Sequence, residues 1–178
     1  MEDLELLINL HRPAERQGPG GEAETRLAAQ LAGLHSARRL RIADIGCGTG
    51  ASAFLLAREL DAEITAVDFL QPFLDELLAR AERRGVAHSI ATRACSMDAL
   101  PFDDEEFDVI WSEGAVYNMG FAAGIADWRR FLKPGGVLAV SEITWFTAER
   151  PAELQAHWEA EYPEIGTASE KMAVLERH

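Results

Sequence analysis

The chain has 178 residues, a length that predicts one domain around one hydrophobic core. Seventeen basic residues stand against thirty acidic ones, and the net charge of -13 argues against a nucleic-acid or membrane surface as the main partner, because phosphate contacts need a basic face. No apolar run approaches the length of a membrane span, and the acidic N-terminus does not resemble a secretory signal. Cys47 and Cys95 lie far apart and form no Cys-x-x-Cys pair, so we expect no metal site and a reducing cytoplasm.

Short apolar runs alternate with longer amphipathic segments along the chain, a pattern typical of a parallel α/β sheet. Residues 1–12 are expected to form a short helix or arm and residues 13–21 a loop. Strands are expected at 40–45, 63–68, 89–95, 107–112 and 137–144. Helices are expected at 22–35, 51–60, 72–84 and 121–132, and again from residue 151 to the end with a break near Pro163–Gly166. This alternation predicts a doubly wound sheet, which binds ligands at the carboxyl ends of its strands.

The first strand ends in a glycine-rich turn that contains Gly46, Cys47 and Gly48. Glycines let the backbone turn sharply and approach a ligand where a Cβ would collide, and the following helix offers free N–H groups. Asp68 ends the second strand, where its carboxylate can accept both hydroxyls of a ribose. These residues fit a nicotinamide cofactor and another adenosine cofactor equally well, since Gly46-x-Gly48-x-x-Ala51 also matches the dinucleotide fingerprint. A turn that serves packing alone is the third interpretation.

Further motifs distinguish between these two kinds of cofactor. They are Asp44 before the glycine turn, Ser96–Phe102 after the third strand, Phe107–Asp108 and Trp111–Gly114 at the two ends of the fourth, and Leu132–Gly136 before the fifth. Together they resemble the class I S-adenosylmethionine-dependent methyltransferases, over a region from about Asp44 to Glu142. The segments Arg16–Gly20, Ser112–Asn118 and Tyr162–Ile165 are similar to a little-characterised bacterial branch of small-molecule methyltransferases, whose core is similar to that of the quinone-biosynthesis C-methyltransferases.

The resemblance implies S-adenosylmethionine as the cofactor and S-adenosylhomocysteine as its product. It places the methionine part at the glycine turn and Asp44, the ribose at Asp68, and the adenine between Phe69 and Asp98. The implied cofactor-binding set is Gln17, Asp44, Gly46, Cys47, Gly48, Asp68, Phe69, Met97, Asp98, Ser112 and Glu113. The alternatives are ordinary ones: solvated aspartates at 68 and 98, and a core aromatic at 69.

Glu113 and Tyr117 are the candidate catalytic residues, because the resemblance places the end of the fourth strand beside the reacting centre. Glu113 is expected to act as a base or to hold a substrate cation, or alternatively to cap the following segment as a structural carboxylate. Tyr117 and Asn118 are candidates for contact with a small-molecule acceptor. A base is needed only if the attacking atom must lose a proton. The loop from Arg16 to Gly20 is expected to be a lid over the cofactor, or merely a linker.

The resemblance implies a Rossmann-like, mostly parallel sheet of seven strands, and we find no sequence here for the last two, which form an antiparallel hairpin in the family. We therefore expect a single domain made of an arm or lid (1–21), a cofactor-binding core (22–144) and a helical segment that is truncated relative to the family (145–178). The fifth strand becomes a sheet edge, which favours a homodimer, because unpaired edges template pairing. The alternative is that residues 151–178 fold back over this edge. A cofactor-binding module without catalysis and an NAD-dependent oxidoreductase stay open as other functions.

Overall fold

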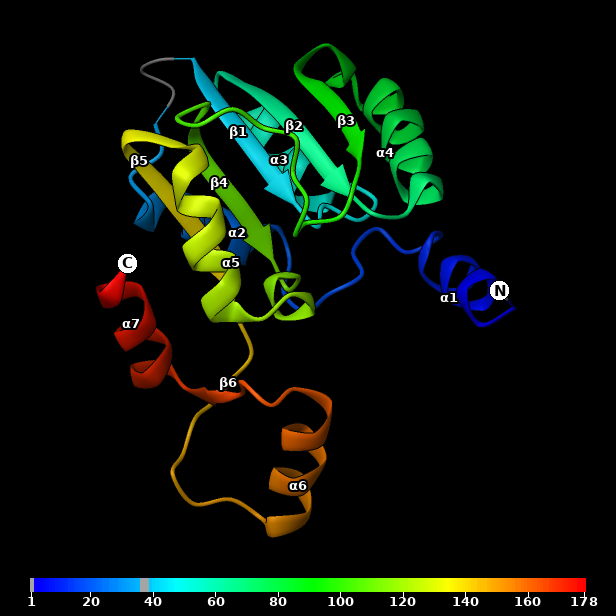
Figure 1. Ribbon diagram of the computed structural model, residues 1–178. Helices are drawn as coiled ribbons and strands as arrows, with labels where there is room; N and C mark the ends of the chain where they lie inside the picture. The colour runs from blue at the N-terminus through cyan, green and yellow to red at the C-terminus, as the bar shows by residue number, and fades with distance from the viewer. Residues whose placement is uncertain (1, 36–38) are drawn as a thin grey trace.

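The computed structural model describes residues 2–35 and 39–178. Its centre is a five-stranded sheet in which every pair of neighbouring strands is parallel. The strands are β1 (Leu40–Ile45), β2 (Ala62–Asp68), β3 (Ile90–Ala94), β4 (Phe107–Glu113) and β5 (Leu132–Ser141), in the spatial order β3-β2-β1-β4-β5 (Figure 1). The chain therefore runs outward from β1 to β3 and then returns to the centre with β4. This order confirms the doubly wound, Rossmann-like sheet.

The helices are α1 (Glu2–His11), α2 (Glu22–Leu31), α3 (Ala51–Glu59), α4 (Gln71–Arg84), α5 (Phe121–Trp128), α6 (Ala152–Glu161) and α7 (Ala168–Arg177). α2, α3 and α4 pack on one face of the sheet and α5 and α7 on the other, whereas α1 and α6 lie away from it (Figure 1). On β1, Ile42 packs in the core cluster shared with α2, α3 and α4. Ala43 and Ile45 of the same strand pack in a second core cluster, on the other face of the sheet, with residues of α5 that include Phe121 and Trp128. Both clusters are buried because a strand sends successive side chains to opposite faces.

Local signals account for the best-predicted helix, α4. Pro72 stands in its first turn, where the missing N–H removes no helical hydrogen bond. Gly85 ends the helix in the left-handed conformation, at φ +72°, and its N–H bonds back to the last turn. The observed range, Gln71–Arg84, differs by one residue from the predicted 72–84.

Two predicted helices are too long. The helix expected at 22–35 ends at Leu31, and the one expected at 121–132 ends as an α-helix at Trp128. The residues after Trp128 form a 3₁₀ turn, η3 (Arg129–Phe131), which leads directly into β5. Helix ends often tighten in this way, so sequence periodicity places them poorly.

The fifth strand was expected at 137–144, and this boundary is wrong at both ends. β5 begins at Leu132 and ends at Ser141, and the expected turn at Lys133–Gly136 lies inside the strand. The ladder continues through it with an irregularity, since Leu132 pairs with Phe107 and Val137 with Val109. Lys133 bridges to buried Asp108 at 2.9 Å, which holds this stretch against β4.

The C-terminal segment extends beyond the sheet (Figure 1). α6 has no buried residue, whereas α7 packs on α5 through Val174 and Leu175. The break expected near Pro163–Gly166 is confirmed, but it contains an unpredicted two-residue parallel pair, β6 (Thr144–Trp145) with β7 (Gly166–Thr167). Within 2–35 and 39–178, β5 pairs with β4 and with no further strand. α7 contributes Leu175 to a groove that is also lined by Leu138 of β5.

In the part of the chain that the structure describes, no helix combines the length and apolar character needed to cross a bilayer.

Candidate cofactor site

The strand order places the glycine turn at the point where the winding direction reverses. β1 and β4 are neighbours, and the chain leaves their carboxyl ends toward opposite faces of the sheet. Sheets of this kind bind ligands in the crevice outside that point. A cavity of about 660 Å³ lies there, a size typical of small-molecule sites.

Segments distant in sequence line this cavity: α1, the N-terminal loop, the glycine turn, the loop after β3 and the end of β4. The predicted residues on its wall are Gln17, Gly46, Cys47, Gly48, Asp68, Phe69, Met97, Asp98, Glu113 and Tyr117. Asn118 and the loop residues Arg16 to Pro19 line it too. The structure therefore brings together all the predicted site residues except Asp44 and Ser112.

The glycine turn forms a cradle that side chains would fill. Gly46 and Gly48 have φ values of +76° and +54°, which disfavour any other residue. A Cβ on Gly46 would collide with the Cβ of Ala115, and one on Gly48 with the side-chain oxygen of Gln17. The absence of a Cβ at these two positions therefore lets Ala115 and the side chain of Gln17 pack closely against the turn.

Asp44 lies beneath this turn and is almost fully buried. Its Oδ2 accepts a 2.6 Å hydrogen bond from the Ser52 hydroxyl, whereas its buried Oδ1 has no partner among the described residues. Burial raises the pKa of Asp44 to about 7, and the nearby Glu113 carboxylate acts in the same direction. An unpartnered buried oxygen is costly, and a ligand cation or its bound water would satisfy it.

Asp68 is held in one orientation by the backbone. Its Oδ2 accepts from the Gly48 N–H and its Oδ1 from the Leu70 N–H, both at 2.9 Å. Each oxygen keeps a second lone pair, so the carboxylate can still accept from two ligand hydroxyls. The pKa of Asp68 is raised, mainly by burial.

Phe69 is 70% exposed and lines the cavity, so the interpretation of it as a core aromatic is wrong. Asp98 is also exposed at the cavity wall, and Met97 is pinned there because its carbonyl accepts from the Trp128 indole N–H at 3.0 Å. These three residues lie on the loops after β2 and β3. They are free to contact a flat ligand group.

Ser112 is fully buried, and its hydroxyl donates to the Ile45 carbonyl at 2.8 Å. This bond braces the two central strands β1 and β4. Its side chain therefore points away from the cavity, and sequence alone could not show which way the strand end faces.

Glu113 lines the cavity but both of its carboxylate oxygens are engaged. Oε2 accepts from the Arg16 guanidinium at 2.5 Å and from the Thr25 hydroxyl at 3.1 Å. Oε1 accepts from the Trp111 indole N–H at 2.9 Å. This arrangement favours the structural interpretation of Glu113, as the anchor of the N-terminal loop, over the role of base.

Tyr117 lies in a short 3₁₀ turn, η2 (Val116–Asn118), and is 46% exposed at the cavity. Its ring meets that of Tyr162 edge to face at 6.1 Å between centroids. The adjacent Asn118 donates to the Ala115 carbonyl at 2.9 Å, which closes the turn. Tyr117 thus reaches the cavity from the side where the C-terminal segment packs.

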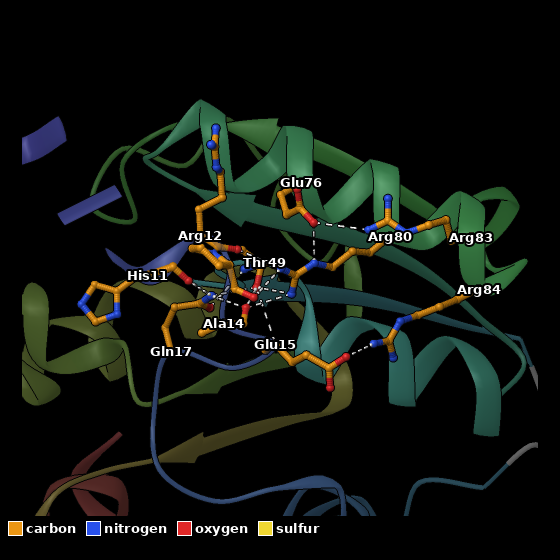
Figure 2. A network of polar contacts seen from close by, with 11 residues as sticks. His11, Arg12, Ala14, Glu15, Gln17, Thr49, Glu76, Arg80, Arg83 and Arg84 are labelled. Atoms are coloured by element: carbon orange, nitrogen blue, oxygen red, sulfur yellow. Dashed lines mark hydrogen bonds and ion pairs between the residues drawn. The ribbon is translucent and has the colours of Figure 1, made fainter. Parts of the chain in front are cut away.

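Sequence reasoning missed Thr25, Thr49 and Arg80, which hold the N-terminal loop in place. A signal for Arg80 was available, because it continues the apolar stripe of α4 that contains Phe73 and Leu77. A cation in such a stripe needs a specific set of acceptors. Figure 2 shows that set, which includes main-chain carbonyls of the N-terminal loop.

The match to known proteins covers this same region: residues 42–136 match the family described as "Methyltransferase domain". The chain belongs to this methyltransferase family. The match confirms the predicted class I S-adenosylmethionine-dependent methyltransferase fold and S-adenosylmethionine as the family's cofactor.

Three relatives illustrate the range of this methyltransferase family. The 27-O-demethylrifamycin SV methyltransferase of Amycolatopsis mediterranei is 31% identical over 137 residues, which are 76% of this chain and 50% of that protein. A Geobacter sulfurreducens methyltransferase, solved with S-adenosyl-L-homocysteine, has a TM-score of 0.75 at 26% identity and covers 89% of this chain and 63% of that one. The [4+2]-cyclase SpnF has a TM-score of 0.74 at 27% identity and covers 92% of this chain and 60% of that one. The chain spans about half the length of the curated relatives it matches.

Proposed function

We propose that the protein transfers a methyl group from S-adenosylmethionine to a small-molecule acceptor. The observation that carries the proposal is the cavity at the β1–β4 reversal point, which is lined by the glycine turn and Asp68, with the unpartnered Oδ1 of Asp44 buried beneath that turn. Two curated relatives support methyl transfer as the reaction. One is named as a 27-O-demethylrifamycin SV methyltransferase and the other as a malonyl-[acyl-carrier protein] O-methyltransferase.

The residues present fit the cofactor. Asp44 supplies an anionic oxygen for its ammonium group, Asp68 accepts from its ribose hydroxyls, and Phe69 and Asp98 contact its adenine. When bound, the cofactor supplies an activated methyl group on a sulfonium centre. Gly46, Cys47 and Gly48 line the cavity, so the backbone of the turn faces the bound cofactor.

The remaining wall is suited to holding an acceptor. Tyr117 and Asn118 reach the cavity from η2, and Leu4, Leu7 and His11 of α1 line it from the other side. Positioning and exclusion of water are the main contributions of these groups, because an in-line displacement depends on alignment of the reacting atoms. We propose that residues 1–21 form an arm over the cofactor, residues 22–144 bind it, and residues 145–178 support the acceptor side.

The first test is calorimetric titration with S-adenosylmethionine, S-adenosylhomocysteine and NAD. We expect binding of the first two and none of NAD. Asp68→Ala should weaken the binding of S-adenosylhomocysteine at least tenfold, since charge-assisted hydrogen bonds contribute roughly 1.5–3 kcal/mol each. Asp61→Ala is the matched control, because Asp61 is exposed at the opposite end of β2. The proposal would be overturned if the wild-type protein bound neither S-adenosylmethionine nor S-adenosylhomocysteine.

A second candidate is a cofactor-binding protein that performs no methyl transfer. The similarity to the structure of a [4+2]-cyclase favours this candidate, because that protein has the same fold and is named for a reaction other than methyl transfer. Release of S-adenosylhomocysteine in the presence of a panel of hydroxylated and amine acceptors separates the two. Cofactor binding with no product from any acceptor would favour the second candidate.

We also propose a cytoplasmic location and self-association. Both cysteines are free thiols, which suits a reducing compartment. The outer edge of β5 carries no further strand within the described ranges, which suits pairing with a second copy.

A further inference from the structure

We propose that Arg80 is a positioning residue for cofactor binding. It lies on α4 outside the cavity wall and holds residues 12–14 of the N-terminal loop, so that Gln17 lies against the glycine turn. This inference rests on the proposed function, because it concerns affinity for the same cofactor.

All five N–H donors of the Arg80 guanidinium have acceptors (Figure 2). Nε donates to Glu76 Oε1 at 2.7 Å, within α4. Nη2 donates to the carbonyls of Arg12 at 2.8 Å and Pro13 at 3.3 Å. Nη1 donates to the carbonyl of Ala14 at 2.9 Å and to the Thr49 hydroxyl at 3.2 Å. Three consecutive main-chain carbonyls of the loop therefore converge on one buried cation.

The Thr49 hydroxyl joins this cation to the cofactor turn. It is fully buried, accepts from Arg80 and from the Gln17 side-chain amide at 2.7 Å, and donates to the Ala14 carbonyl at 3.1 Å. A hydroxyl has one donor and two acceptor positions, and here all three are used. Fully satisfied buried networks of this kind specify one arrangement, because any partial loosening leaves a polar group unpaired.

Gln17 connects the hydrogen-bond network of Arg80 and Thr49 to the cavity wall. Its Oε1 accepts from the Thr49 N–H at 3.2 Å and occupies the space where a Cβ on Gly48 would stand. Gln17 and Arg16 both line the cavity, whereas Arg80 and Thr49 do not. The network thus fixes one wall of the cofactor site from behind.

The other contacts of the loop are polar ones further along the chain, where Glu15 pairs with Arg84 and Arg16 with Glu113. Arg12, Pro13 and Glu15 are exposed, so the loop buries little apolar surface of its own. Burying a guanidinium is costly unless every donor is paired, and only the planar fork of arginine reaches this many acceptors at once. A lysine would offer three donors from a single nitrogen and would leave carbonyls of the loop without partners.

The decisive experiment compares Arg80→Lys with Arg130→Lys, a control in η3 whose side chain is 63% exposed and does not line the cavity. We expect Arg80→Lys to weaken the binding of S-adenosylhomocysteine, measured by calorimetry, about tenfold or more, and Arg130→Lys to leave it unchanged. Hydrogen exchange at residues 14–18 should accelerate in Arg80→Lys alone. Unchanged affinity in a folded Arg80→Lys variant would overturn the role.

A mutant cycle distinguishes positioning from a merely structural role. If Arg80 acts through Gln17, the losses of affinity in Arg80→Lys and Gln17→Ala should not add in the double variant. Additive losses would overturn the proposed route. If Arg80→Lys does not fold, Thr49→Val tests the same junction, with the same expected loss and the same cycle. If the wild-type protein does not bind S-adenosylhomocysteine, the proposed function is refuted. If the wild-type protein binds it and the Arg80→Lys variant binds it equally well, only the role of Arg80 is refuted.

Discussion

At the scale of single residues, the carboxylates around the glycine turn have different environments. Asp44 is buried with one unpartnered oxygen, Asp68 is fixed by two backbone N–H groups, and Glu113 is paired with Arg16. Three acidic groups close together disfavour ionisation of the most buried one. Asp44 is therefore the group whose charge a bound cation would stabilise most.

Asp44→Asn should remove a pH dependence of stability. The pKa of Asp44 rises from 3.8 to about 7 in the folded protein, mainly through burial, so the folded state holds this proton more tightly than the unfolded state. The free energy of unfolding of the wild type should therefore fall as the pH rises from about 4 to about 7, by at most roughly 4 kcal/mol. Denaturant unfolding from pH 4 to pH 8 measures this. Parallel pH profiles for the variant and the wild type would contradict the assignment.

Glu113→Gln should weaken cofactor affinity and turnover together. The amide keeps one acceptor oxygen, so Arg16 loses its counter-charge and the N-terminal loop loosens at the cavity. We expect a several-fold rise in the Kd for S-adenosylhomocysteine and a loss of about 1 kcal/mol in stability, since the pair is only partly exposed. Loss of turnover with an unchanged Kd would instead restore Glu113 to the role of base.

At the scale of elements, α7 is tied to the body of the protein by one buried lysine. Lys171 Nζ donates to the Tyr162 hydroxyl at 3.0 Å and to the Glu164 carbonyl at 2.7 Å. It also lies 3.3 Å from a carboxylate oxygen of Glu142, whose side chain is 5% exposed, and 4.7 Å from the centre of the Phe121 ring. This cluster joins the end of β5, the start of α5 and α7.

Lys171→Met should lower the free energy of unfolding by about 3–5 kcal/mol, because it leaves the Glu142 carboxylate buried without a cation. Adding Glu142→Gln should recover part of that loss, since the remaining group is neutral. Thermal and denaturant unfolding of the single and double variants measure both effects. A single variant as stable as the wild type would show that Glu142 finds solvent or another partner.

At the scale of the whole molecule, the edge strands are unequal. β3 closes one side of the sheet next to α4, while β5 presents ten residues on the other side, with Val137, Leu138 and Val140 half-buried. Leu138 lies in a groove whose wall includes Leu175 of α7 and Arg129 of η3. An edge of this length invites pairing with a second strand.

We therefore expect self-association through the β5 side. Light scattering over a range of protein concentrations should give a mass above the 19.6 kDa of one chain. Val137→Lys, which places a charge on this edge, should shift the mass toward that of the monomer, whereas a lysine on the exposed β3 residue Ala94 should not. A constant mass of one chain at high concentration would refute the prediction, and a mass changed only by the β3 variant would refute its stated cause.

Features that depend on neighbours along the chain could be predicted from the residues alone. Apolar periodicity, with Pro72 and Gly85 at the ends of α4, predicted the strands and most helices. The motif set from Asp44 to Gly136 predicted the fold, the cofactor and nine lining residues of the cavity, and the segment Arg16–Gly20 added Gln17. These signals are local, because glycine conformation and strand alternation are properties of short segments.

The contacts that those residues make depend on the packing of distant elements and could not be predicted in this way. Ser112 donates to the Ile45 carbonyl, and Glu113 accepts from Arg16 and Trp111. The expected turn at Lys133–Gly136 is part of β5. Arg80 donates to carbonyls more than sixty residues away in sequence. Partners at such separations are set by the way the elements pack, and a hydrogen-bond acceptor on the backbone has no signature in the residue type that carries it.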